Sequence, residues 1–266
     1  MIRLIALDLD NTLLMEDNSI PGEVCEALRR ISCSGVEVMI ASGRLLPFAL
    51  DYAEEIDCRG PIMAYNGGWL ETREGEVLFQ ALIPESIRQE MAVFCRENHL
   101  YLQQYDPWGG HQICIEKLRE DFPLARYRLP DSYYRECRKL EDAAIQTPKL
   151  VIYDRPERLK SLLPIIRERF DPALDYSFSD HSILEMMPRG VSKGSTLQLY
   201  CESRGIRPEE VMAFGDSGND ASMLRYAGIG IAVANASGEI RELADYQARG
   251  ARSFGVLEGL ERFILF

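Results

Sequence analysis

The sequence predicts an α/β protein with a doubly wound parallel sheet, interrupted by an inserted α+β segment. Three observations lead to this fold class. Short apolar runs alternate with helical patterns at both ends of the 266-residue chain, polar residues follow several of the apolar runs, and the middle of the chain lacks that alternation. We therefore expect a core formed by residues 1–82 and 189–266 and an inserted domain formed by residues 83–188.

The N-terminal part alternates strand and helix. Apolar runs at residues 2–7, 36–40 and 61–65 predict buried strands, because each is short and ends in polar or glycine residues. Between them, Pro21 begins a helix that Gly35 ends, and a second helical pattern runs to about residue 56.

The alternation resumes near the C-terminus, whereas the middle mixes short strands with two helices. The expected later elements of the core are a helix at 192–203, strands at 211–214 and 229–233, and a helix that Ser237 caps. In the middle we expect helices at 84–98 and 156–170, strands at 101–105, 112–115, 150–153, 174–178 and 183–187, and irregular sequence after residue 115.

Composition excludes several classes of protein. The formal net charge is −12, which argues against nucleic-acid binding, because phosphate backbones are held by clustered Lys and Arg. Seven cysteines without a C-x-x-C pair, and no apolar run long enough for a signal peptide or a membrane span, predict a cytoplasmic protein. We expect a small-molecule partner, no nucleic acid or membrane, and a monomer or homodimer.

Asp8 and Asp10 end the first predicted strand. Two residues apart in an extended chain, their carboxylates would share one face and repel unless a cation or proton lay between them. This pattern suits a Mg²⁺ site in which one carboxylate is also a nucleophile. Taken alone, the pair is better explained as a solvated strand end.

A second acidic cluster favours the metal site over the solvated strand end. Asp216, Asn219 and Asp220 follow the strand expected at 211–214, with glycines that suit a tight loop. Because parallel strands end at one edge of their sheet, both clusters are expected to meet there and to supply the oxygen ligands that Mg²⁺ prefers.

Two further positions are compatible with an anion site, although Ser42 alone is better explained as a helix N-cap and a single lysine is usually a solvated surface charge. Ser42 lies where a strand ends and a helix begins, which places a hydroxyl and backbone N–H groups together. Lys193 lies near the start of a helix, where the dipole disfavours a cation, so a role in neutralising a phosphate is favoured.

These residues closely resemble the motifs of the haloacid dehalogenase (HAD) superfamily of phosphatases. Residues 8–13 resemble its first motif, 41–44 the second, 189–194 the third and 215–220 the fourth. The insertion is similar to the C2-type (IIB) cap of the Cof-like subfamily, as is the turn at 66–68. Position 11 departs from that subfamily, because Asn stands where Gly is usual.

The resemblance implies a Rossmann-like catalytic core, a substrate-specificity cap and a role for each motif residue. Asp8 would attack phosphorus and form an aspartyl-phosphate, while Asp10 would protonate the leaving oxygen and then activate water. Mg²⁺ would be held by Asp8, the Asp10 backbone carbonyl, Asp216 and Asp220. The expected phosphate-binding residues are Ser42, Gly43, Lys193 and Asn219.

Cap residues are expected to select the leaving group, and a sugar phosphate or similar metabolite is the expected substrate class. The candidate substrate residues are Arg44, Asn66, Trp108, His111 and His181, although Trp108 and His181 are also compatible with structural roles. Two alternatives stay open: a phosphomutase of the same fold, and a non-catalytic protein that binds a phosphorylated ligand.

Overall fold

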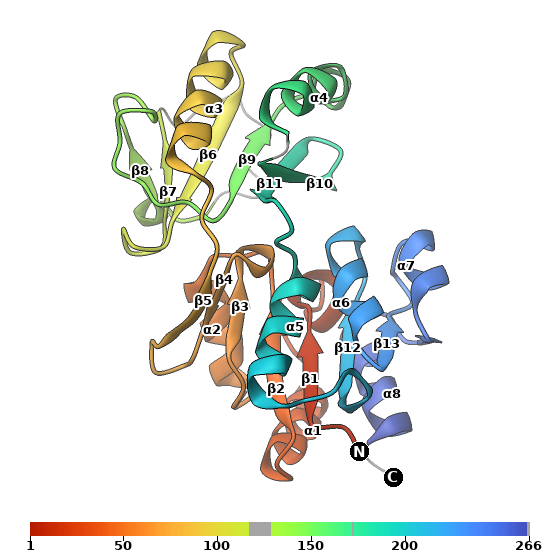
Figure 1. Ribbon diagram of the computed structural model, residues 1–266. Helices are drawn as coiled ribbons and strands as arrows, with labels where there is room; N and C mark the ends of the chain where they lie inside the picture. Colours follow the sequence, from red (N-terminus) through yellow and green to blue (C-terminus); the bar gives the residue numbers. More distant parts are fainter. Residues whose placement is uncertain (117–128, 172, 265–266) are drawn as a thin grey trace. The chain divides into compact units, whose positions relative to one another are not determined.

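The computed structural model in Figure 1 describes residues 1–116, 129–171 and 173–264. The chain divides into two compact units, Met1–Gln80 with Val191–Phe266, and Ala81–Gly190. The division falls two residues from each boundary expected from the sequence. Of the irregular sequence expected after residue 115, residues 117–128 lie outside the described residues, and the remainder contains a short strand at Tyr134–Glu136 that the sequence analysis missed.

The first unit contains an eight-stranded sheet in the order β14-β13-β12-β1-β2-β3-β4-β5. The strands from β14 to β3 run parallel, and β4 and β5 are antiparallel additions at one edge. The strands are β1 (Leu4–Leu7), β2 (Glu37–Ala41), β3 (Ile62–Ala64), β4 (Trp69–Glu71), β5 (Val77–Gln80), β12 (Val211–Gly215), β13 (Ile229–Ala232) and β14 (Tyr246–Gln247).

Helices cover both faces of this sheet, as the doubly wound prediction requires. In Figure 1, α5 and α6 pack together on one face, while α1 packs with α8 on the other. The helices of this unit are α1 (Gly22–Cys33), α2 (Leu46–Glu55), α5 (Lys193–Arg204), α6 (Ala221–Tyr226), α7 (Gly238–Leu243) and α8 (Ser253–Phe263). The sequence analysis missed the β4–β5 hairpin, β14, α6 and α8.

The central strands form the core of the unit. Every residue of β1 and β12 is buried, because helices lie over both faces and neighbouring strands pair on both sides. Such strands are continuously apolar, which is why their sequences show no alternation. The polar residues that follow them are thereby carried to the carboxyl edge of the sheet.

The second unit is an α+β domain with a six-stranded sheet in the order β10-β11-β9-β6-β7-β8. Apart from the parallel pair β7–β8, neighbouring strands are antiparallel. Its elements are α3 (Glu85–Glu97), β6 (Tyr101–Asp106), β7 (Gln112–Ile115), β8 (Tyr134–Glu136), β9 (Leu150–Tyr153), α4 (Pro156–Phe170), β10 (Leu174–Asp180) and β11 (Ile183–Pro188).

One face of the second sheet forms an apolar core with its helices. Leu102, Ile152 and Leu184 alternate inward along their strands and join Met91 of α3 and Leu159 of α4 in one buried cluster. This unit therefore has a hydrophobic core of its own. No helix in the described parts of the chain is long and apolar enough to cross a bilayer.

Candidate active site

The site begins where three neighbouring strands of the first unit end. β1 pairs in register with both β2 and β12, so the three strands stop at nearly the same level of the sheet. Asp8 follows β1, Ser42 follows β2 and Asp216 follows β12. All three side chains are buried, so the parallel sheet gathers them at one edge.

The chain after β1 coils at once, and this corrects one expectation. Residues Leu9–Leu13 form a single wide helical turn, closed by the Leu13 N–H donating to the Asp8 carbonyl oxygen (3.2 Å). Asp8 and Asp10 therefore do not share the face of an extended strand. Asp8 turns into the protein with 4% exposure, whereas the Asp10 side chain is 52% exposed.

The same turn explains the unusual residue at position 11. Asn11 has φ of 61° and ψ of 2°, which is the left-handed region. Asn is one of the few residues other than Gly that enters this region readily. Asn11 is therefore compatible with the left-handed conformation that this turn requires.

Lys193 lies between two buried carboxylates. Its Nζ donates to Asp8 Oδ1 (2.6 Å) and to Asp220 Oδ1 (2.7 Å), and the lysine side chain is fully buried. Oxygens of Asp8, Asp216 and Asp220 all lie within 4.8 Å of one another. The structure thus brings together residues from the first, third and fourth sequence motifs.

The loop after β12 is shaped around Asp220. Its Oδ2 accepts hydrogen bonds from the backbone N–H groups of Asp216 (3.0 Å) and Ser217 (3.1 Å). A Cβ at Gly215 would lie 2.4 Å from the Asp220 Cβ, so this position requires glycine. Asp220 consequently holds both the loop and Lys193.

Burial and repulsion disturb the acid–base behaviour of the cluster. Burial, followed by repulsion from Asp220, raises the pKa of Asp8 well above its usual value, although Lys193 opposes the shift. Burial and Asp220 likewise raise the pKa of Asp216 to about 7. Burial would lower the pKa of Lys193, but the carboxylates of Asp220 and Asp8 outweigh it and raise that pKa.

The donor set fits a divalent cation. Three buried carboxylates face a single ammonium group, so they carry excess negative charge when they are ionised. Hard cations such as Mg²⁺ and Ca²⁺ prefer oxygen ligands of this kind, and a cation would relieve the repulsion that raises the pKa values. Asp8, Asp216 and Asp220 could therefore hold a divalent metal.

The predicted phosphate-binding residues lie beside this cluster. Ser42 is buried and its Oγ accepts from the backbone N–H of Arg44 (3.1 Å). Asn66 has φ of 56°, and its Oδ1 accepts from Asn219 Nδ2 (3.1 Å). A Cβ at Gly43 would lie 2.6 Å from Asn66 Oδ1, so Gly43 packs closely against Asn66. Asn66 thus contacts both Gly43 of the second motif and Asn219 of the fourth.

Arg44, a candidate substrate residue, binds the side chain of Asp10 in this structure. Its guanidinium binds Asp10 in bidentate fashion, with Nε 3.0 Å from Oδ2 and Nη2 2.5 Å from Oδ1. Asn18 accepts from Nη2 (3.1 Å), and the guanidinium lies 5.5 Å from the centre of the Tyr52 ring. Because this geometry fixes both partners, Arg44 orients the Asp10 carboxylate in this structure.

Sequence reasoning overlooked two polar contacts. Thr12 Oγ1 donates to Asp216 Oδ1 (3.3 Å), and Asn235 Nδ2 donates to the Asn11 carbonyl oxygen (2.8 Å). Thr12 stands within the first motif and was open to detection. Asn235 matched only a glycosylation pattern, and nothing in the sequence connects it to a loop more than 200 residues earlier.

The remaining candidates belong to the second unit. Trp108, 57% exposed, and His111 lie in the turn between β6 and β7, whereas His181 lies in the turn between β10 and β11. β6 and β11 both run antiparallel to β9, so the two turns lie at opposite ends of that sheet. Trp108 and His111 therefore share one turn, and His181 lies at the other end of the sheet.

The fold and the carboxylate site define a doubly wound α/β core with an inserted α+β unit and a buried acidic site. A family model described as haloacid dehalogenase-like hydrolase matches residues 5–260, and the chain belongs to this family. The predicted resemblance and fold class are thus confirmed, as is the prediction of an enzyme, a hydrolase of this family.

Individual relatives cover the whole chain. A phosphoglycolate phosphatase of Methanothermobacter thermautotrophicus is 30% identical over 99% of both chains. A solved haloacid dehalogenase-like hydrolase from Bacteroides thetaiotaomicron, 29% identical, superposes with a TM-score of 0.89 over 99% of this chain and 100% of that one. The subclass IIB sugar phosphatase BT4131, 24% identical, shares the fold with a TM-score of 0.82 over 99% and 100% of the two chains.

Proposed function

We propose that the protein is a Mg²⁺-dependent phosphatase that hydrolyses a small phosphorylated metabolite through an aspartyl-phosphate on Asp8. One observation carries the proposal: Asp8 is buried at the carboxyl end of the central strand, 2.6 Å from Lys193 and beside Asp216 and Asp220. A buried carboxylate with a fixed cation beside it is arranged to attack an anionic centre.

The first step forms one bond and breaks another. A carboxylate oxygen of Asp8 bonds to phosphorus as the bond to the leaving oxygen breaks, and Asp10 donates a proton to that oxygen. In the second step water attacks phosphorus, its proton passes to Asp10, and phosphate leaves with the bond to Asp8 broken. The two aspartates are thereby restored.

Charge neutralisation accompanies both steps. Lys193, Ser42, Gly43 and Asn219 supply donors for the transferring phosphoryl oxygens, as the packing of their loops around Asp8 supports. Mg²⁺, held by Asp8, Asp216, Asp220 and the Asp10 backbone carbonyl, would neutralise developing charge on the phosphoryl oxygens.

For the substrate, we propose a sugar phosphate or a similar small phosphoester. The relatives named as a phosphoglycolate phosphatase and a sugar phosphatase support small phosphorylated substrates. We propose that the second unit selects the leaving group, either through Trp108 and His111 in one turn or through His181 at the opposite end of the sheet. The seven free cysteines support a reducing compartment such as the cytoplasm.

A panel of phosphorylated metabolites, incubated with the protein and Mg²⁺, tests the proposal by phosphate release. Asp8→Asn is the matched control, since it removes the nucleophile with little change of shape. Release from at least one substrate by the wild type alone is expected, and equal release by both proteins would refute the proposal. An isomerised sugar phosphate with little free phosphate would instead identify a phosphomutase.

A further inference from the structure

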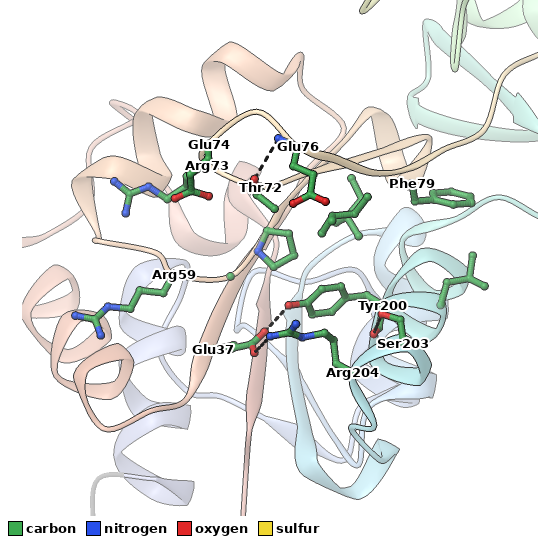
Figure 2. Close-up of a pocket in the computed structure, with 15 residues that line it drawn as sticks. Glu37, Arg59, Thr72, Arg73, Glu74, Glu76, Phe79, Tyr200, Ser203 and Arg204 are labelled. Atoms are coloured by element: carbon green, nitrogen blue, oxygen red, sulfur yellow. Dashed lines mark hydrogen bonds and ion pairs between the residues drawn. The ribbon is translucent and has the colours of Figure 1, made fainter.

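A groove in the first unit lies apart from the carboxylate cluster. It has a volume of about 840 Å³ and lies between the β4–β5 hairpin and α5, with Gly60 and Pro61 also lining it (Figure 2). Glu37, the first residue of β2, belongs to the lining, whereas Ser42 follows the other end of that strand. The groove therefore opens near the amino ends of strands whose carboxyl ends carry the site.

Apolar side chains from both walls are exposed at this groove. Leu78 of β5 is 42% exposed and Leu199 of α5 is 47% exposed, although both are large apolar residues. Phe79 is half-buried beside them and also lines the groove. Single exposed leucines are ordinary, but two that converge on one groove mark an interaction surface.

The groove borders the outermost strand of the sheet. β5 pairs with β4 and forms one edge of the eight-stranded sheet. Its sequence, Val77–Gln80, contains neither a charge nor a proline, two of the features that protect an edge strand against pairing with another chain, although the strand has only four residues. The strand and the exposed leucines thus present a continuous surface.

The polar part of the groove is held in place. Figure 2 shows Tyr200 on α5 directed at Glu37, where its hydroxyl donates to Oε2 (2.5 Å). Arg204 lies 3.5 Å from the same carboxylate, and Arg73 lies 3.2 Å from Asp57. Ordered charged groups of this kind need lose little freedom when they meet a partner.

Charge indicates which partner fits. The whole chain has a net charge of −12, so two copies repel each other over most of their surfaces. The charged groups that line the groove instead cancel: Arg59, Arg73 and Arg204 against Glu37, Glu74 and Glu76, with no lysine. A neutral patch that carries both signs can pair with itself across a two-fold axis but gives no steering to a strongly charged partner.

We propose that this groove is where two copies of the chain associate as a symmetric dimer, through β5 and the exposed face of α5. Arginine and aromatic residues are enriched in such interfaces and lysine is depleted, as in this lining. The inference is independent of the proposed reaction. Since the carboxylate cluster lies at the other ends of the strands, breaking the dimer is expected to leave turnover intact.

Sedimentation equilibrium over low to high micromolar concentrations tests the proposal. We expect the wild-type mass to rise with concentration toward twice the 30.2 kDa of one chain. Leu78→Glu and Leu199→Glu are each expected to raise the dissociation constant by about tenfold or more, because each places a charge among the apolar contacts. Ile165→Glu, at a residue of α4 that is 49% exposed, makes the same change away from the groove and is expected to have no effect.

Two results would overturn the proposal. One is a wild-type mass of 30.2 kDa at every concentration, and the other is dimerisation of both groove variants with wild-type affinity. Circular dichroism tests whether each variant folds. If a glutamate variant does not fold, the glutamine variant at the same position, Leu78→Gln or Leu199→Gln, takes its place. Hydrogen exchange gives an independent readout, since protection of the β5 amides should increase with concentration.

Discussion

Within the described residues, Lys193 is the only one whose cationic side chain pairs with Asp8 and Asp220, and replacing it with Met removes that charge. The lysine is fully buried, and its Nζ lies 2.6 Å from Asp8 and 2.7 Å from Asp220. Methionine has a similar length and no charge, so the substitution removes the ammonium group with little change in packing. In metal-free protein the carboxylates are then left without their partner.

The size of the effect follows from this burial. Removing one partner of a buried ion pair costs about 3–5 kcal/mol, because the other charge stays desolvated. For a domain of this size, about 1 kcal/mol lowers Tm by about 2–4 °C, so we expect a fall of about 6–20 °C. An exposed lysine contributes far less, since solvent screens its charge.

The loss is also expected to depend on pH. The folded-state pKa of Asp216 is raised from 3.8 to about 7, and that of Asp8 is raised as well. A raised pKa stabilises the folded state at low pH, and this contribution is lost as pH rises from about 4 through about 7. The Lys193→Met protein should therefore be least destabilised near pH 5 and most destabilised near pH 8.

Thermal unfolding of metal-free protein, followed by calorimetry at pH 5 and pH 8, measures both effects. Lys160→Met is the control, because Lys160 is an exposed residue of α4. Equal Tm values for Lys193→Met and Lys160→Met at pH 8 would refute the view that Lys193 compensates buried carboxylates.

Three further predictions concern the same region. Because the pKa of Asp216 is about 7, the affinity for Mg²⁺ is expected to rise between about pH 6 and pH 8, and binding should release a proton. Calorimetry in buffers of different ionisation enthalpy measures this release, and finding none would contradict the prediction. Gly215→Ala is expected to cost about 1–3 kcal/mol in denaturant unfolding, because its Cβ would lie 2.4 Å from that of Asp220, whereas Gly218→Ala meets nothing within 4 Å and serves as the control. Arg44→Ala is expected to lower kcat/KM by about 10- to 100-fold without changing the affinity for Mg²⁺, because Asp10 loses its bidentate partner. Partial recovery of kcat/KM in Arg44→Lys would distinguish lost orientation from misfolding.

Much of the architecture could be predicted because buried strands and helices leave strong local signals. The strand expected at 150–153 and the helix expected at 156–170 match β9 and α4 to the residue, and β1 and β12 follow clear apolar runs. The β4–β5 hairpin was missed because β4 has only three residues and β5 is partly exposed, so neither gives the fully buried apolar run that marked β1 and β9.

The members of the carboxylate cluster could be named from the sequence, but their geometry could not. The resemblance to the haloacid dehalogenase motifs implied that Asp8 and Lys193 act at one site, yet no local rule shows that the lysine bridges Asp8 and Asp220 across 185 and 27 residues of sequence. The assumption of an extended chain failed for Asp10, because the wide turn stabilised by the Leu13–Asp8 hydrogen bond begins immediately after the strand.

Trp108 and His181 show a second limit. Both were reasonable candidates as exposed aromatic or titratable residues, but only strand order reveals that their turns lie at opposite ends of one sheet. Strand order in a mixed sheet depends on long-range pairing, which is not encoded in local patterns.

Detection of the phosphorylated enzyme tests the central claim most directly. The protein is mixed with a hydrolysed substrate and Mg²⁺, quenched in acid within a single turnover, digested and examined by mass spectrometry. The account predicts one added phosphoryl group on the peptide containing Asp8, absent from Asp8→Asn and, once formed, lost more slowly in Asp10→Asn than in the wild type. Turnover of that substrate with no phosphoryl group on Asp8 at any quench time would contradict it.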